Sequence, residues 1–119
     1  MQLIVNERNF SQEVLESSTP VLINFWAPWC GLCRLMTPML NQLQADWEGQ
    51  IKLVTINADE NFKLANTFRL TTLPTLLLVD GDNVLHRFDH FASRDDIRNA
   101  STSFNAVLSS LVGSYSYTA

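Results

Sequence analysis

The spacing of hydrophobic positions changes along the chain, and these changes predict an alternation of strands and helices. Residues 21–26, VLINFW, form a nearly continuous apolar run with one polar member, Asn24. Such a run is typical of a strand that is covered on both faces. Shorter β-prone runs predict further strands at residues 2–5, 51–57, 75–79 and 84–88.

The strongest helical pattern lies in residues 32–47, where apolar side chains recur at spacings of three and four. This spacing places them on one face of a helix, which we interpret as core packing. Weaker patterns predict three more helices, at residues 9–16, 61–68 and 93–111. Asn9 or Ser11 is available to cap the first of these, and Ser93 can cap the last.

The predicted elements follow the order β-α-β-α-β-α-β-β-α. This order predicts an α/β fold with a mixed central sheet and helices on both faces. Residues that follow Trp26 then lie at the carboxyl end of a central strand, where open α/β sheets usually hold their sites. Cys30 and Cys33, which are the two cysteines of the chain, lie in this segment.

Composition sets the size of the core and the class of partner. With 119 residues, of which 46% are hydrophobic, the chain can bury a core without a disulfide or metal staple. We expect one domain over residues 1–112 and a mobile tail over residues 113–119, because the last segment has nothing to bury. A net charge of −4 and the lack of a basic run argue against binding to nucleic acid or to a membrane.

The first residues bear on the cellular compartment. Their apolar run covers only residues 3–5, whereas a signal peptide has about 7–15 apolar residues and a membrane span about 20. We therefore expect a cytoplasmic protein. In a reducing cytosol, two neighbouring cysteines are more often catalytic or metal-binding than structural.

The chemistry of the chain is concentrated in Cys30-Gly31-Leu32-Cys33 at the start of a predicted helix. The spacing brings the two sulfurs onto one helical turn, where they can bond. The helix N-terminus favours the thiolate of Cys30, which is the nucleophile in disulfide exchange. We expect Gly31 to allow a tight turn that leaves Cys30 open, and Cys33 to be more buried and to resolve the mixed disulfide.

These residues resemble the thioredoxin family. The shared motifs are FWAPWCGLC at residues 25–33, Pro38 within the next helix, NAD at 57–59 and LPT at 73–75. The resemblance implies the thioredoxin fold and a protein disulfide oxidoreductase that acts in cell redox homeostasis. It also implies disulfide-containing target proteins as substrates, a thioredoxin reductase as electron donor, and no cofactor or metal beyond the redox-active Cys30–Cys33 disulfide. We expect a monomer.

The resemblance further implies a cis peptide bond before Pro74. This proline would lie against the cysteine pair and, with Trp29 and Leu73, shape the groove in which substrates dock. The sequence departs from the family at Leu32, where most members have proline. Leucine restores a backbone N–H near the thiolate, which predicts a lower pKa of Cys30 and a more oxidising pair.

Two departures concern the strands behind the cysteines. Asn24 stands where the family usually has a buried Asp that is thought to accept the proton of the inner cysteine, and Thr55 stands where members often have Lys. The two changes agree physically, because a buried ammonium without a carboxylate would lack its partner. One interpretation is that the two residues only replace buried charges in the core and have no functional effect. The other is that Cys33 resolves the mixed disulfide slowly, because its thiol is harder to deprotonate.

The last departures lie beside the predicted groove. Thr72 and His90 stand where family members commonly have glycine. The added bulk of both residues and the titratable imidazole of His90 would change which partners dock. The alternative for His90 is a solvated loop residue without a role.

Three other functions stay open at this point. His86 and His90 could complete a Cys₂His₂ zinc site, although the gap between the pairs is far longer than in a zinc finger. The domain could also be a protein-binding module that has lost efficient turnover, because fold alone does not fix function. The third alternative is an oxidant or isomerase that uses the same two cysteines.

Overall fold

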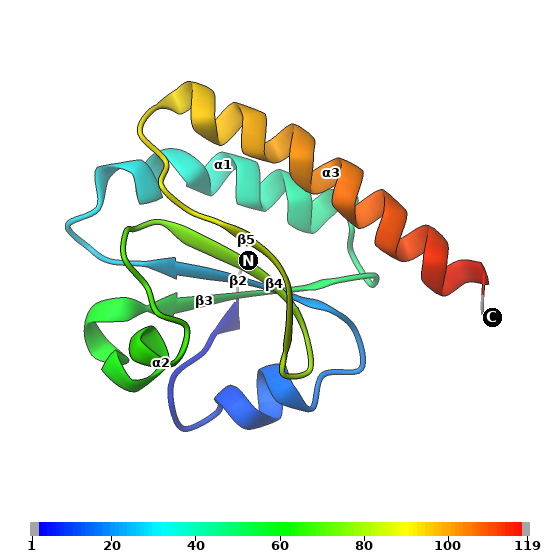
Figure 1. Cartoon of the computed structure of the whole chain (residues 1–119), viewed down its shortest axis with the longest axis horizontal. Coiled ribbons are helices and arrows are strands. Elements are labelled where there is room, and N and C mark those ends of the chain that lie inside the picture. The colour runs from blue at the N-terminus through cyan, green and yellow to red at the C-terminus, as the bar shows by residue number, and fades with distance from the viewer. Residues whose placement is uncertain (1–2, 118–119) are drawn as a thin grey trace.

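A central sheet with helices on both faces organises the chain, of which this computed structural model describes residues 3–117 (Figure 1). The strands are β1 (Leu3–Ile4), β2 (Val21–Trp26), β3 (Lys52–Asn57), β4 (Thr75–Asp80) and β5 (Asn83–Phe88). The helical segments are η1 (Ser11–Leu15), α1 (Gly31–Asp46), η2 (Ala58–Glu60), α2 (Phe62–Thr67) and α3 (Arg94–Tyr117). The predicted fold class and order of elements are confirmed.

The strands are arranged in the order β1-β3-β2-β4-β5. β1 and β2 run parallel to β3, whereas β4 is antiparallel to β2 and β5 is antiparallel to β4. In this register Phe25 pairs with Thr75, and Leu76 pairs with Phe88. The carboxyl end of β2, the amino end of β4 and the carboxyl end of β5 therefore lie at one edge of the sheet.

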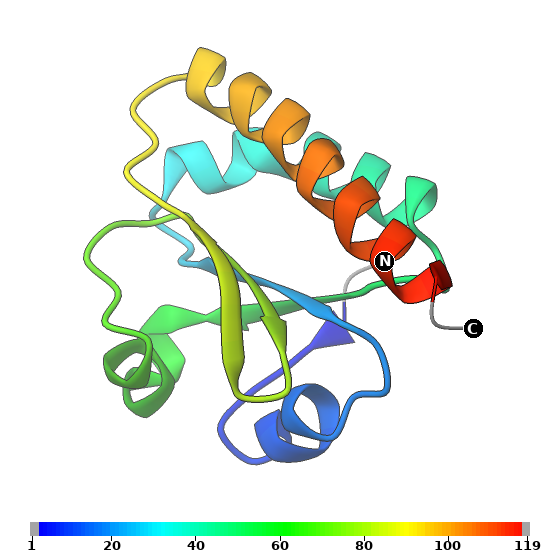
Figure 2. The same ribbon diagram turned by 45° about the vertical axis from the view of Figure 1, so that its right-hand side comes forward.

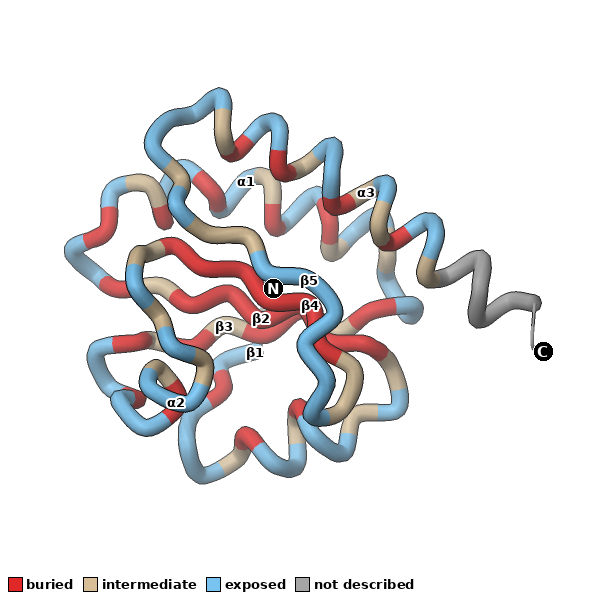
Figure 3. Tube along the Cα trace, viewed as in Figure 1, coloured by how far each residue is buried: buried red, intermediate tan, exposed pale blue. Residues whose placement is uncertain are grey.

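Alternation along β2 divides the core into two layers. Leu22 packs toward α1 and α3, and Ile23 and Phe25 pack on the opposite face with η1 and α2 (Figures 1 and 2). The central strands are buried on both sides, as the red segments of Figure 3 show. Each large apolar side chain buried in this way contributes about 1.5–3 kcal/mol to stability. Asn24 shares the parity of Leu22, so it faces the layer that contains α1.

The helix starts differ in how they are capped. The predicted cap of the last helix is confirmed, because the Asp96 N–H donates to Ser93 Oγ at 3.4 Å. The predicted cap of the first helix is wrong, since η1 begins without a side-chain cap. Asn9 is occupied elsewhere, because its Oδ1 accepts from the Asn6 N–H at 2.7 Å.

The end of the chain extends the last helix. α3 continues to Tyr117, through five residues of the predicted tail, and residues 118–119 lie outside the described part of the chain. The mobility of the tail and the domain limit at residue 112 stay predictions. Within residues 3–117, none of the helices combines the length and the apolar content that a membrane crossing requires.

Candidate active site

The two cysteines lie at the start of α1 and are joined by a disulfide bond. Their Cα atoms are 5.3 Å apart, within the range that a disulfide can bridge. Cys30 is the N-cap residue of α1, and its Sγ accepts a hydrogen bond from the Cys33 N–H at 3.2 Å. The first N–H groups of a helix lack partners within the helix, so the sulfur of Cys30 takes the place of a capping oxygen.

Two expectations about this loop are wrong. Cys33 is not the more buried cysteine of the oxidised pair, because it is 7% exposed and Cys30 is 4% exposed. The reason is that Cys33 lines a groove behind the helix. Cys30 is also not left open beside Gly31, because only 4% of its surface is exposed, although Gly31 is the first residue of α1 and a Cβ placed on it would meet no atom within 4 Å.

Trp29 precedes the disulfide and exposes 69% of its surface. The indole is nevertheless held in place, because its Nε1–H donates to Asp59 Oδ2 at 3.0 Å. Asp59 lies in η2, directly after β3, at the carboxyl end of the parallel strands. Sequence reasoning did not single out Asp59 as a site residue, although the NAD motif that contains it follows a strand adjacent to β2.

The Leu73–Pro74 peptide bond is cis, as the family resemblance implied. Pro74 directly precedes β4, at the sheet edge that also carries the loop from β2 to Cys30. The preceding loop is bonded internally, because Thr75 Oγ1–H donates to the Thr72 carbonyl oxygen at 2.7 Å. The structure thus brings Leu73 and Pro74 to the edge that holds the cysteines.

Thr72 and His90, the two predicted groove residues, are bonded to each other. The His90 N–H donates to Thr72 Oγ1 at 3.1 Å and links the loop before β4 to the chain after β5. His90 has a φ of 59°, a left-handed conformation that glycine adopts more readily. The imidazole is 66% exposed, and its Nε2 lies 3.7 Å from Asp89 Oδ2.

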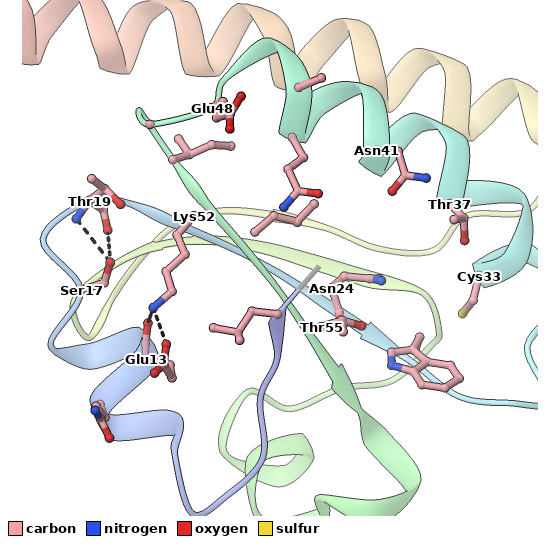
Figure 4. Close-up of a pocket in the computed structure, with 18 of the residues that line it drawn as sticks. Glu13, Ser17, Thr19, Asn24, Cys33, Thr37, Asn41, Glu48, Lys52 and Thr55 are labelled. Carbon is pink, nitrogen blue, oxygen red and sulfur yellow. Dashed lines mark hydrogen bonds and ion pairs between the residues drawn. The ribbon is translucent and has the colours of Figure 1, made fainter. Parts of the chain in front are cut away.

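A groove of about 1700 Å³ runs along α1 behind the disulfide. Cys33, Asn24 and Thr55 all line this groove, with Thr37 on the helix side (Figure 4). Asn24 pairs with Thr55 in the β2–β3 register, and Thr55 Oγ1–H donates to the Asn24 carbonyl oxygen at 3.4 Å. The two predicted supporting residues therefore share a polar groove with the inner cysteine.

His86 and His90 were the candidate partners of the cysteines in a zinc site. Among residues 3–117, no group of three or more His, Cys, Asp and Glu side chains is placed to hold a metal ion. The ring of His86 instead stacks on Phe88 in β5, with the centroids 6.0 Å apart. Arg87 was missed by sequence reasoning because its guanidinium donates to the carbonyl oxygens of Phe68 and Arg69, 19 and 18 residues earlier in the chain.

Comparison with known proteins connects this geometry to a family. The sequence model of the thioredoxin family matches residues 1–103. Thioredoxin 1 of Nostoc sp. is 44% identical over 77 residues, which cover 65% of this chain and 72% of that protein. Thioredoxin 1 of Synechococcus elongatus is 44% identical over 81 residues, which cover 67% of this chain and 76% of that protein.

A chloroplast protein is also similar. The M-type thioredoxin of Chlamydomonas reinhardtii is 39% identical over 77 residues, which cover 65% of this chain and 55% of that protein. The family model spans the sheet, both cysteines and the cis proline. The chain therefore belongs to the thioredoxin family and is a thiol–disulfide oxidoreductase that carries the disulfide Cys30–Cys33.

Proposed function

We propose that this protein reduces disulfides of target proteins, with Cys30 as the attacking thiol and Cys33 as the resolving thiol. The observation that supports this assignment is the place of Cys30 as N-cap of α1, where its Sγ accepts the Cys33 N–H at 3.2 Å. Backbone N–H groups and the positive end of the helix dipole stabilise a thiolate more than a thiol. The nucleophilic form of Cys30 is thereby favoured in the reduced protein.

The reaction proceeds in two exchanges. The Cys30 thiolate attacks one sulfur of the target disulfide, a Cys30–target bond forms, and the other target sulfur leaves as a thiolate that takes up a proton. Cys33 then loses its proton and attacks Cys30 Sγ, which releases the second target sulfur. Two electrons have passed to the target, and the protein is left with the Cys30–Cys33 disulfide.

The oxidised protein needs two electrons and two protons before it can act again. We assign this step to a disulfide reductase of the thioredoxin reductase type, which family membership supports. We place the cycle in the cytoplasm, because that compartment keeps thiols reduced and supplies such a donor. Trp29, Leu73 and Pro74 would contact the target, since Trp29 directly precedes Cys30 and the Leu73–Pro74 bond leads into β4 at the same edge of the sheet.

The cysteine roles predict a difference between two single variants. Cys33→Ser retains the attacking thiol but cannot resolve, so we expect it to accumulate a mixed disulfide with insulin. Cys30→Ser should trap none, and the wild-type protein should reduce insulin catalytically. Non-reducing electrophoresis and mass spectrometry measure the adduct. An adduct on Cys30→Ser would reverse the roles, and a wild-type protein without turnover would favour the protein-binding alternative.

Leu32 is the departure that acts most directly on Cys30. It is the second residue of α1, so its backbone N–H is one of the unpaired donors at the helix start. A proline at this position would remove that donor. We infer that the leucine lowers the pKa of the Cys30 thiol and thereby favours the reduced, dithiol form.

Substitution of Leu32 tests this inference. In Leu32→Pro we expect a higher pKa of Cys30 than in the wild-type protein, because one N–H donor is lost. Leu32→Ala retains the donor and serves as the control, with an unchanged pKa. Ultraviolet absorbance of the thiolate during a pH titration of the reduced proteins measures the pKa. A lower pKa in Leu32→Pro would contradict the inference.

Asn24 bears on the second exchange. An asparagine amide cannot take the proton that Cys33 must lose, and this residue is 6% exposed in the groove that Cys33 also lines. We propose that the proton of Cys33 leaves to water in this groove. The resolving step is then slower than with a carboxylate beside the thiol, which would act as a general base.

A carboxylate introduced at this position should speed up resolution. We expect Asn24→Asp to increase insulin turnover by about tenfold, less than the roughly 100-fold low end of general-base effects, because turnover also includes steps that the carboxylate does not speed up. Asn41→Asp is a matched control, because Asn41 lines the same groove but lies about 12 Å further along α1 from Cys33. Steady-state rates measure both variants. Unchanged turnover in Asn24→Asp would indicate that Asn24 is only a core residue.

A further inference from the structure

Arg87 connects two segments that are separate in the sequence, the end of β5 and the chain after α2. It lies in β5, and its Nε–H donates to Asp89 Oδ2 at 2.8 Å. Its two terminal nitrogens donate to the carbonyl oxygens of Phe68 and Arg69, the latter at 2.8 Å. One guanidinium group thus joins β5 to the chain that leaves α2, 18 and 19 residues earlier in the sequence.

The two carbonyl groups that Arg87 binds lie where α2 ends. Phe68 is the C-cap residue of α2, and carbonyl groups at a helix C-terminus lack partners within the helix. The Phe68 carbonyl also lies at the negative end of the helix dipole, which a cation stabilises. Arg69 has a φ of 52°, so it turns the chain in the left-handed conformation that often follows a helix. Arg87 therefore holds the point at which the chain changes direction toward Pro74.

The loop before β4 is also held by hydrogen bonds at Thr72, which lies further along the chain toward Pro74. The His90 N–H donates to Thr72 Oγ1, and Thr75 Oγ1–H donates to the Thr72 carbonyl oxygen. Residues 68–75 are thus bonded to β5, or to the loop after it, at both ends of the turn. These bonds fix the loop that ends at Pro74 and begins β4.

This loop lies where a protein substrate must approach. Thr75 pairs with Phe25, near the end of the strand that leads to Cys30. Cys30 is only 4% exposed, so a target chain that reaches its sulfur must also contact the loops beside it. A small disulfide makes far fewer such contacts. We propose that Arg87 is a positioning residue that fixes residues 68–75 as a preformed wall for protein substrates, an inference that rests on the proposed reduction of protein disulfides.

If the guanidinium of Arg87 is removed, we expect the protein to bind protein substrates less tightly while the reactivity of Cys30 changes little. A loop that must be ordered when the substrate binds adds a free-energy cost to binding, which the preformed loop avoids. Arg87 touches neither sulfur in the described contacts. Removal of its guanidinium should therefore raise KM for a protein substrate and leave the reactivity of Cys30 toward a small disulfide unchanged.

The test compares Arg87→Ala with the wild-type protein on insulin and on cystine. We expect KM for insulin to rise about three- to tenfold with kcat within about twofold, and cystine reduction to stay within about twofold. Arg87→Lys retains the charge but not the planar fork, so its KM should lie between the two. Arg98→Ala removes an exposed arginine of α3 and should leave all values unchanged.

Amide hydrogen exchange gives a second readout that does not depend on activity. In Arg87→Ala, and more weakly in Arg87→Lys, the amides of residues 70–73 should exchange faster, while those of β2 should not change. An unchanged KM for insulin, an equal loss on insulin and cystine, or unchanged exchange at residues 70–73 would overturn the inference. A wild-type protein that reduces cystine but not insulin would instead contradict the proposed function, and hydrogen exchange would still decide whether Arg87 holds the loop.

Discussion

The burial of β2 between two helical layers determines where the reactive sulfurs lie. Leu22 packs against α1 and α3, whereas Ile23 and Phe25 pack against the opposite layer. Because β2 is packed on both faces, its position is fixed. The residues that follow it therefore lie at the edge of the sheet where α1 begins. Cys30 consequently becomes the N-cap of α1, and the electrostatics of a helix start act on its sulfur.

The same alternation sets the surroundings of the inner cysteine. Because Asn24 shares the parity of Leu22, it faces α1, and its neighbour Thr55 completes a polar groove that reaches Cys33. An amide and a hydroxyl occupy positions where the family usually has charged groups. Neither β2 nor β3 supplies a carboxylate to this groove, which is the basis of the proposal that the proton of Cys33 leaves to water. The loop before β4 is joined to the end of β5 and to the loop after it by Arg87 and by the Thr72–His90 bond, and we propose that it forms another wall of the site.

The sequence predicted what local pattern and motif can encode. Continuous apolar residues indicated β2, the spacing of three and four indicated α1, and the Cys-x-x-Cys motif at their junction indicated the site. Contacts between distant segments could not be predicted in this way. Arg87 reaches Arg69, and Trp29 reaches Asp59, across gaps that no periodicity records.

The burial of individual side chains and the choice of helix caps also could not be predicted from the sequence. The relative exposure of Cys30 and Cys33 depends on a groove built from β2, β3 and α1, whereas the motif alone suggested that the second cysteine is deeper. Asn9 had the right chemistry for a cap, but its side-chain Oδ1 accepts a hydrogen bond from the Asn6 N–H instead. Several acceptors of similar chemistry compete for each donor, and only the folded chain selects among them.

The reduction potential of the Cys30–Cys33 couple depends on both cysteines and on the N–H groups at the start of α1. It can be measured by thiol trapping after equilibration in buffers of defined redox potential. A helix start that carries an additional N–H at Leu32 stabilises the thiolate, so the account predicts a reversible two-electron couple less negative than about −270 mV, the value typical of thioredoxin, and toward the about −180 mV of disulfide isomerases. A midpoint at or below about −270 mV would contradict the role given to Leu32. The absence of a reversible couple would contradict the role given to the two cysteines.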